Sequence, residues 1–206
     1  MFQNNSFFGG VIYIDLRNYT KIVEEKVLSN IADIIYDYQE LVTKKINKIF
    51  NKKTISTIEY MGDGILVILN NSLVSKNLSN SYKNSTTSDV ICIEIYKASK
   101  ILKDDLSEFL KNKKEQYTGL EKLDFGIGIS CSKIFQKYHK KDERKIFFGT
   151  SLNRAAKIGD SMNEKYNNVA IDKKMYDEYL LDILDNSEKN KLKFREKPLV
   201  HMYRTE

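Results

Sequence analysis

Two aspartates stand where protein chains often place a metal-binding carboxylate. Asp15 directly follows the apolar run VIYI, and Asp63 lies in a Gly-Asp-Gly sequence between two β-favouring runs. Ionised carboxylates are hard oxygen ligands that suit Mg²⁺ or Mn²⁺. Each acid also has a structural interpretation, Asp15 as the cap of a following helix and Asp63 as an ordinary turn residue. Both interpretations stay open from position alone, although an acid at a turn tip has no core to hide in.

The elements that must position these acids are a strand before Asp15 and a hairpin around Asp63. Residues 54–69, TISTIEYMGDGILVIL, contain an Asp-Gly turn between β-forming runs, which is a strong hairpin signal. The polar segment LRNYT after Asp15 predicts a strand-to-helix connection. Backbone N–H groups at such a connection can hold phosphate while the acid holds a metal.

The rest of the chain predicts alternating helices and strands. Helices are expected at 29–50, 88–109 with Ser88 as its cap, 152–162 and 173–184, and strands at 123–131, 169–172 and 199–203. Gly126 and Gly128 alternate with apolar residues in a strand, which indicates the close approach of another backbone or a ligand. This order predicts an α+β fold with a mostly antiparallel sheet, in a single domain spanning residues 1–206.

Composition restricts the class of protein. Hydrophobic residues make up 41% and charged residues 30% of the 206 residues, as in a globular protein with a large core. Two cysteines without CxxC spacing indicate a reducing compartment. No segment approaches the ~20 apolar residues of a membrane span. We expect a cytoplasmic protein without membrane insertion. We also expect no nucleic-acid partner, because the basic residues behind the net charge of +6 are scattered.

Four segments, in order, resemble the catalytic domain of the class III nucleotidyl cyclases. They are IDLRNYT at the first acid, EYMGDGILVIL at the second, DFGIGIS and FFGTSLNRAAKI. The resemblance extends from near Phe8 to Tyr203. It implies the class III cyclase fold, a ferredoxin-like sheet flanked by helices, and cyclisation of a nucleoside triphosphate with two Mn²⁺ or Mg²⁺ ions per site.

The resemblance also implies a role for individual residues. Lys157 stands where the family has an arginine that stabilises the pentavalent phosphate; lysine keeps the charge but loses the bidentate fork. Pro198 replaces a family glycine beside the phosphate-binding basic residues. The implied metal ligands are Asp15, Leu16 and Asp63, the implied ribose contact is Asn153, and the implied phosphate contacts are Asn18, Tyr19, Thr20, Arg195 and Lys197.

Family members work as head-to-tail dimers in which one chain supplies the metal acids and the other supplies the base, ribose and phosphate contacts. This chain carries both sets of residues. The resemblance therefore implies a homodimer with two equivalent sites and an inactive monomer.

The base-reading positions match neither purine code. In purine cyclases the residue four before the hairpin aspartate is lysine for adenine and glutamate for guanine, and here it is Glu59. The partner position, seven before the helix asparagine, is usually Asp or Thr in adenylate cyclases and often Cys in guanylate cyclases. Ile146 stands there and cannot hydrogen-bond through its side chain.

A compact chain with a broken purine code is similar to the Pycsar antiphage cyclases, which make cyclic UMP or cyclic CMP. The Glu59 carboxylate matches the N3–H donor of uracil better than the N3 acceptor of cytosine, so UTP is the predicted substrate. Cytidylate and purine (guanylate or adenylate) cyclases are the alternatives. The resemblance also implies a separate effector protein that binds the cyclic product. A nucleotide-binding module that has lost catalysis is the alternative from another class, favoured by Lys157 and Pro198.

Overall fold

The computed structural model describes residues 5–25, 28–71, 86–139, 144–197 and 200–205, with side chains at 25–30 and 195–200 outside that description. The strands are β1 (Asn5–Arg17), β2 (Ile55–Met61), β3 (Gly64–Asn70), β4 (Asp124–His139), β5 (Arg144–Phe148), β6 (Val169–Asp172), β7 (Leu192–Lys197) and β8 (Val200–Thr205). The helices are α1 (Tyr19–Glu25), α2 (Leu28–Ile49), α4 (Thr87–Gln116), α5 (Thr150–Gly159), α6 (Lys173–Met175) and α7 (Asn186–Asn190), with short helical turns at Glu164–Tyr166 and Tyr176–Leu180.

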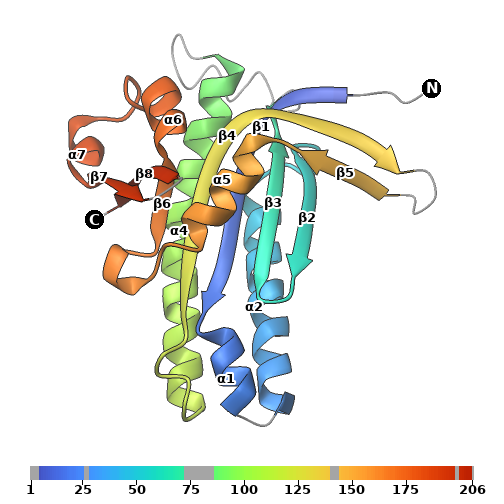
Figure 1. Ribbon diagram of the computed structural model, residues 1–206, viewed down its shortest axis with the longest axis vertical. Coiled ribbons are helices and arrows are strands. Elements are labelled where there is room, and N and C mark those ends of the chain that lie inside the picture. The colour runs from blue at the N-terminus through green and yellow to red at the C-terminus, as the bar shows by residue number, and fades with distance from the viewer. Residues whose placement is uncertain (1–4, 26–27, 72–85, 140–143, 198–199, 206) are drawn as a thin grey trace.

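The described strands form a sheet in the order β2-β3-β1-β4-β6-β8-β7, with β5 paired to β4 (Figure 1). Only the β4–β6 pair among them is parallel. The long strand β1 lies at the centre, between β3 and β4. The expectation of an α+β fold with a mostly antiparallel sheet is confirmed.

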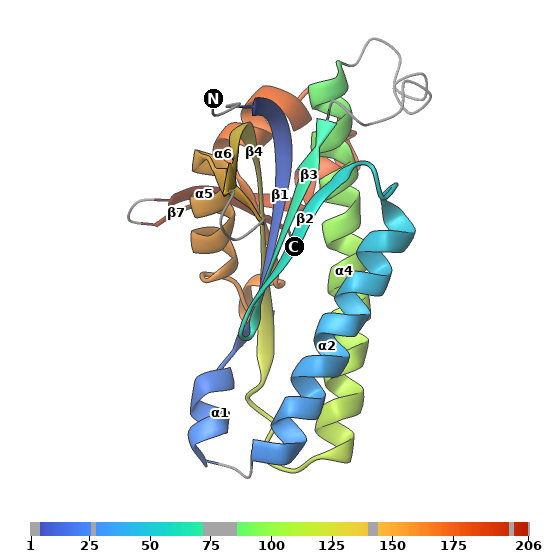
Figure 2. The ribbon, with the colours of Figure 1, turned by 90° about the vertical axis from the view of Figure 1, so that its right-hand side faces the viewer.

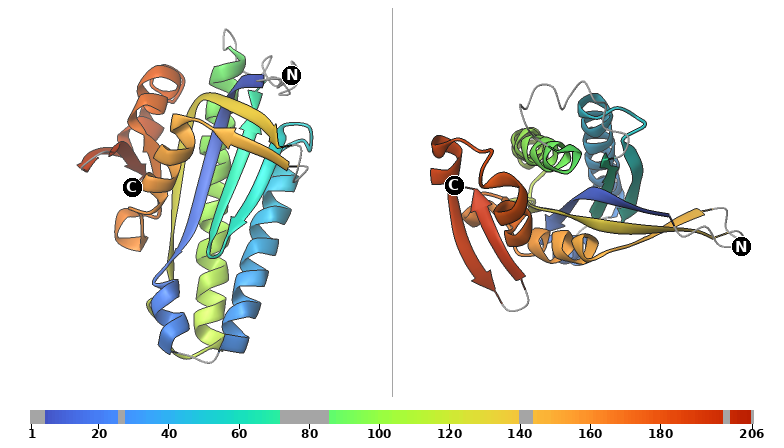
Figure 3. Two further views of the ribbon diagram at one scale, coloured as in Figure 1. Left: turned by 45° about the vertical axis from the view of Figure 1, so that its right-hand side comes forward. Right: turned by 90° about the horizontal axis from the view of Figure 1, so that it is seen from above.

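The helices divide between the two faces of the sheet. Figure 2 and the right-hand view of Figure 3 show α2 and α4 together on one face and α5 on the other. The alternation of side chains along β1 explains this arrangement, because Ile12 and Ile14 belong to the large core under α2 and α4, whereas Val11 and Tyr13 face the smaller cluster under α5. None of the described helices is long and apolar enough to cross a bilayer.

Several element boundaries differ from those expected. Thr86, not Ser88, caps α4: its side chain accepts from the Asp89 amide while the Asp89 carboxylate accepts from the Thr86 amide. The strand expected at 123–131 continues to 139 and pairs with β5, which was not predicted. The strand β7 was also missed. Both segments are rich in lysine and arginine, so they lack the regular alternation of apolar and polar residues that indicates a strand.

Gly126 and Gly128 let α5 lie directly on the sheet. A Cβ on Gly128 would stand 2.0 Å from the Ala155 carbonyl oxygen and 2.4 Å from the Gly159 nitrogen. One on Gly126 would stand 2.2 Å from the Gly159 carbonyl oxygen. The close approach predicted for these glycines is therefore to the backbone of α5.

Replacing Gly128 with alanine should destabilise the protein by about 3 kcal/mol, because neither backbone can move away from the added methyl group. Gly10→Ala is the matched control, since its Cβ would meet side chains and no backbone: Ile95 at 3.0 Å and Ile91 at 3.5 Å, which can shift. Urea unfolding of both variants measures the difference. Equal stability of the two variants would contradict this account of the glycines.

Candidate active site

The structure brings Asp15 and Asp63 together. Asp15 lies near the end of β1, where Gly64 of β3 and Gly126 of β4 are its neighbours across the sheet. Asp63 lies in the turn between β2 and β3, and its carbonyl oxygen accepts a 3.4 Å hydrogen bond from the Leu16 amide. The two acids and the Leu16 main chain thus meet at one edge of the sheet.

Burial sets the electrostatics of the pair. It raises the pKa of Asp15 to about 6, and the neighbouring charges of Asp63 and Asp160 add to the rise, while Arg17 opposes it. Burial also raises the pKa of Asp63. The expectation that Asp63 would have no core to hide in is therefore wrong. Both carboxylates carry negative charge that the protein itself compensates incompletely, which favours a bound cation.

The donor set fits a hard divalent cation. It consists of two carboxylates and nearby main-chain oxygens, the ligand types that Mg²⁺ and Mn²⁺ prefer. Within the described residues no group of three or more His, Cys, Asp or Glu side chains is arranged around a metal position.

Replacing Asp15 with asparagine should stabilise the metal-free protein above about pH 6. The pKa of Asp15 is about 6 in the folded chain against 3.8 as its ordinary value, so stability falls as pH rises between these values. Asparagine does not ionise, so the variant avoids this loss of stability. We expect its free energy of unfolding to exceed that of the wild type by about 1 kcal/mol, because solvent screens part of the electrostatic effect. Urea unfolding in EDTA at about pH 4 and about pH 8 measures it. A gain at the lower pH alone would contradict the prediction.

Two neighbours on the same face of β1 orient Asp15. The Tyr13 hydroxyl donates to Asp15 Oδ1 at 3.4 Å, and Arg17 Nη1 lies 2.9 Å from Asp15 Oδ2. Sequence reasoning missed both residues. Their spacing could have indicated this role, because Tyr13 and Arg17 each lie two residues from Asp15 and residues two apart in a strand share a face.

Helix α2 fixes the hairpin that carries Asp63. The Gln39 side chain donates to the Gly62 carbonyl oxygen at 3.1 Å, and the hydroxyls of Thr43 and Tyr60 share a 2.6 Å hydrogen bond. Gly62 has φ 68°, a left-handed conformation that glycine accepts without strain. These anchors were also missed, since the pattern of α2 predicted only an apolar stripe and a solvated face.

The segment after Asp15 forms the expected strand-to-helix connection. Asn18 has φ 62°, and its side chain donates to the Lys122 carbonyl oxygen at 2.7 Å. Tyr19 begins α1, and Thr20 is exposed in its first turn. The first amides of a helix have no acceptor within it, so they are available to an anion.

Glu59 and Ile146 line one groove, of about 780 Å³. Glu59 comes from β2 and Ile146 from β5, and Phe147 and Leu152 complete the wall between them. Tyr60 also lines the groove and is 49% exposed. The two residues that the resemblance pairs as base readers therefore line the same groove.

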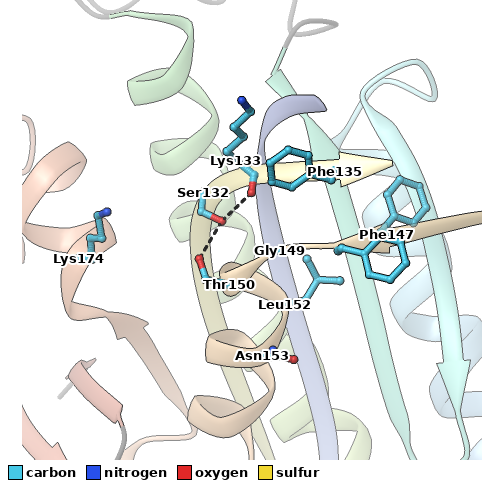
Figure 4. A pocket seen from close by; sticks show the side chains of 10 residues that line it. Ser132, Lys133, Phe135, Phe147, Gly149, Thr150, Leu152, Asn153 and Lys174 are labelled. Atoms are coloured by element: carbon cyan, nitrogen blue, oxygen red, sulfur yellow. Dashed lines mark hydrogen bonds between the residues drawn. The ribbon is translucent and has the colours of Figure 1, made fainter. Parts of the chain in front are cut away.

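Asn153 and Lys157 are exposed on α5, one turn apart. Asn153 lines a second pocket, of about 630 Å³, which shares Phe147 and Leu152 with the groove of Glu59. Figure 4 shows Lys133 of β4 and Asn153 at opposite ends of this pocket.

The N-terminus of α5 is tied to β4 beside this pocket. The Ser132 hydroxyl donates to the Ser151 hydroxyl at 2.8 Å, and the Ser151 amide donates to Ser132 Oγ at 3.2 Å. Arg195 and Lys197 belong to β7, where they pair with Met202 and Val200, and their side chains lie outside the described part of the chain.

No model of a known protein family matches the sequence. No curated protein sequence matches it either.

Solved structures match across almost the whole chain. The adenylyl cyclase CyaB from P. aeruginosa superposes with TM-score 0.72 at 15% identity, covering 99% of this chain and 96% of that one. The guanylyl cyclase Cya2 gives 0.69 at 16% identity, covering 98% and 93%. The guanylate cyclase domain of RhGC from Catenaria anguillulae, solved with GTP, gives 0.63 at 11% identity, covering 98% of both chains. The chain has the fold of the class III adenylyl and guanylyl cyclase domains.

Proposed function

We propose that this chain is a nucleotidyl cyclase that converts a nucleoside triphosphate, with UTP favoured, to its 3′,5′-cyclic monophosphate and pyrophosphate. The observation that carries the proposal is the pairing of Asp15 and Asp63, half-buried carboxylates with raised pKa values at one edge of the sheet. The cyclase fold supports it. A module that only binds nucleotides would have little use for both acids.

Asp15 and Asp63, with the Leu16 main chain between them, would hold two Mg²⁺ or Mn²⁺ ions. Such ions acidify the attacking 3′-hydroxyl and neutralise charge on the phosphates. The backbone amides of Tyr19 and Thr20, at the start of α1, would donate hydrogen bonds to phosphate oxygens. Asn18 forms the turn that precedes them. Arg195 and Lys197 would bind the terminal phosphates.

A head-to-tail homodimer, one catalytic domain per chain over residues 1–206, would complete each site. Asn153 would orient the ribose and Lys157 would stabilise the pentavalent phosphate in the site whose acids belong to the other chain. Exposed aromatic side chains next to the two pockets support a partner surface here; they are Tyr60, Phe135, Tyr138 and Phe148, each between 48% and 52% exposed. Aromatic side chains are enriched at protein–protein interfaces.

Uracil is the favoured base because one groove is lined by the Glu59 carboxylate, an acceptor, and by the apolar Ile146. The Glu59 carboxylate can accept a hydrogen bond from the N3–H of uracil. Ile146, at the second position that reads a purine in the purine cyclases, offers no polar side chain. Cytosine is the first alternative and a purine the next, in line with the adenylyl and guanylyl cyclases that share the fold. The resemblance to the Pycsar cyclases supports a second-messenger role in antiphage defence, with a separate effector protein.

Pyrophosphate release tests the reaction and the base together. The chain is incubated with ATP, GTP, CTP or UTP, each with Mn²⁺ and with EDTA. We expect metal-dependent release that is fastest with UTP. Equal or faster release from GTP or ATP would overturn the base assignment alone. No release from any triphosphate, with binding retained, would favour the catalytically inactive module.

A further inference from the structure

The side chain of Arg17, the last residue of β1, joins the metal carboxylate to the end of α5. Its Nη1 lies 2.9 Å from Asp15 Oδ2. Its Nε donates to the Met162 carbonyl oxygen at 3.2 Å, and its Nη2 donates to the Gly159 carbonyl oxygen. The same Nη2 lies 3.6 Å from Asp160 Oδ1. One guanidinium group therefore contacts a carboxylate of the strand, the carbonyl of the last residue of α5 and the carbonyl of Met162 just beyond that helix.

Arginine suits this position for two physical reasons. The last carbonyls of a helix lack partners within it and carry partial negative charge, which favours a cation there. The planar guanidinium presents five donors in a fixed fork, so it can serve several acceptors on different elements at once, whereas a lysine ammonium has three donors on a flexible stem and no such fork. The Arg17 side chain is only 21% exposed, so water competes little for these contacts.

The packing around Arg17 leaves the end of α5 little freedom. A Cβ on Gly159 would stand 2.8 Å from the Tyr13 ring and 3.2 Å from the Tyr13 carbonyl oxygen. Tyr13 itself donates to Asp15. The end of α5 thus rests on the same stretch of β1 that carries the acid, and a shift of Asp15 or Arg17 must reach it.

We infer that Arg17 is a positioning residue that couples cation binding at Asp15 to the last turn of α5, and so to Lys157. This inference depends on the proposed function, in which Lys157 serves the site whose acids belong to the partner chain. A cation bound at Asp15 would withdraw charge from the carboxylate that pairs with Arg17, and the guanidinium would then bond the Gly159 and Met162 carbonyls more fully. Cation binding in one site would thereby fix the phosphate contact of the other.

Hydrogen exchange without nucleotide tests the coupling directly. The amides of Asp160, Ser161 and Met162 close the end of α5 through bonds of 2.8–3.0 Å. We expect Mn²⁺ to slow their exchange by about threefold in the wild type. Unchanged or faster exchange would overturn the inference, and this arm needs no variant.

Arg17→Lys keeps the charge beside Asp15 but loses the fork. It should lose the Mn²⁺-dependent slowing and lower kcat about tenfold with little change in KM, because Lys157 contacts the transition state. Arg17→Gln serves if the lysine variant does not fold. Arg154→Lys is the matched control, because Arg154 lies on the same helix and pairs with Asp172 at 3.2 Å. The Arg154→Lys variant should keep the Mn²⁺-dependent slowing of amide exchange.

The two arms separate the inference from the proposed function. Mn²⁺-dependent slowing in a protein that cyclises no triphosphate would overturn the proposed function alone. The coupling alone would be overturned if the wild type cyclises a triphosphate but Mn²⁺ does not slow its amide exchange. It would also be overturned if Mn²⁺ still slows amide exchange in Arg17→Lys.

Discussion

Asp63→Asn should lower kcat for cyclisation by about 10³-fold, since a divalent cation at this site contributes several kcal/mol to the transition state. Asparagine has nearly the same size and tolerates turns, so the hairpin should still form. The Asp63 carbonyl still accepts from the Leu16 amide, because that bond is between main chains. The loss should therefore be one of charge at the metal site.

Steady-state turnover of the preferred triphosphate in Mn²⁺ measures the effect. Asp104→Asn, which removes an exposed carboxylate from α4, controls for net charge. Circular dichroism and size-exclusion chromatography should show both variants folded and equally associated. Activity near the wild-type value in Asp63→Asn would remove this residue from the metal site.

Mixing two inactive variants should restore activity. In the proposed head-to-tail dimer, Asp15→Asn removes an acid from one half of the shared site and Asn153→Ala removes the ribose contact from the other half. A heterodimer of the two carries one intact site and one doubly defective site. Random pairing of equal amounts makes half the dimers mixed, so about a quarter of wild-type activity should return.

The recovery should rise and fall with the mixing ratio and peak at equal amounts. Each variant alone should stay inactive at the same total concentration. Mixtures that form heterodimers by native mass spectrometry but recover no activity would contradict the shared site.

Local sequence patterns were enough to predict the strand and the hairpin that carry the two acids, whereas the metal-binding role of the acids came from the family resemblance. An Asp-Gly turn between β-formers and an acid after an apolar strand are signals confined to a few residues, and both elements form as expected. The same holds for α2, predicted at 29–50 and found at 28–49.

What supports the acids could not be predicted from such patterns. Arg17 bonds the carbonyl of Met162, 145 positions away in the sequence, and Gln39 bonds the hairpin turn from another helix. Contacts of this kind depend on how the sheet brings distant segments together. The glycine at position 128 predicted the close approach of another element, but only the fold identified that element as α5. The nearness of Glu59 and Ile146 followed from the resemblance and not from their spacing.

The most direct test is to identify the product. Pyrophosphate release alone does not separate cyclisation from hydrolysis, whereas mass spectrometry after chromatography separates a 3′,5′-cyclic monophosphate from a linear monophosphate, which is heavier by one water. The chain is incubated with UTP and Mn²⁺, beside Asp63→Asn under the same conditions. Cyclic UMP is expected from the wild type and none from the variant. Linear UMP, or unchanged triphosphate with UTP and with each of the other three nucleotides, would contradict the proposed function.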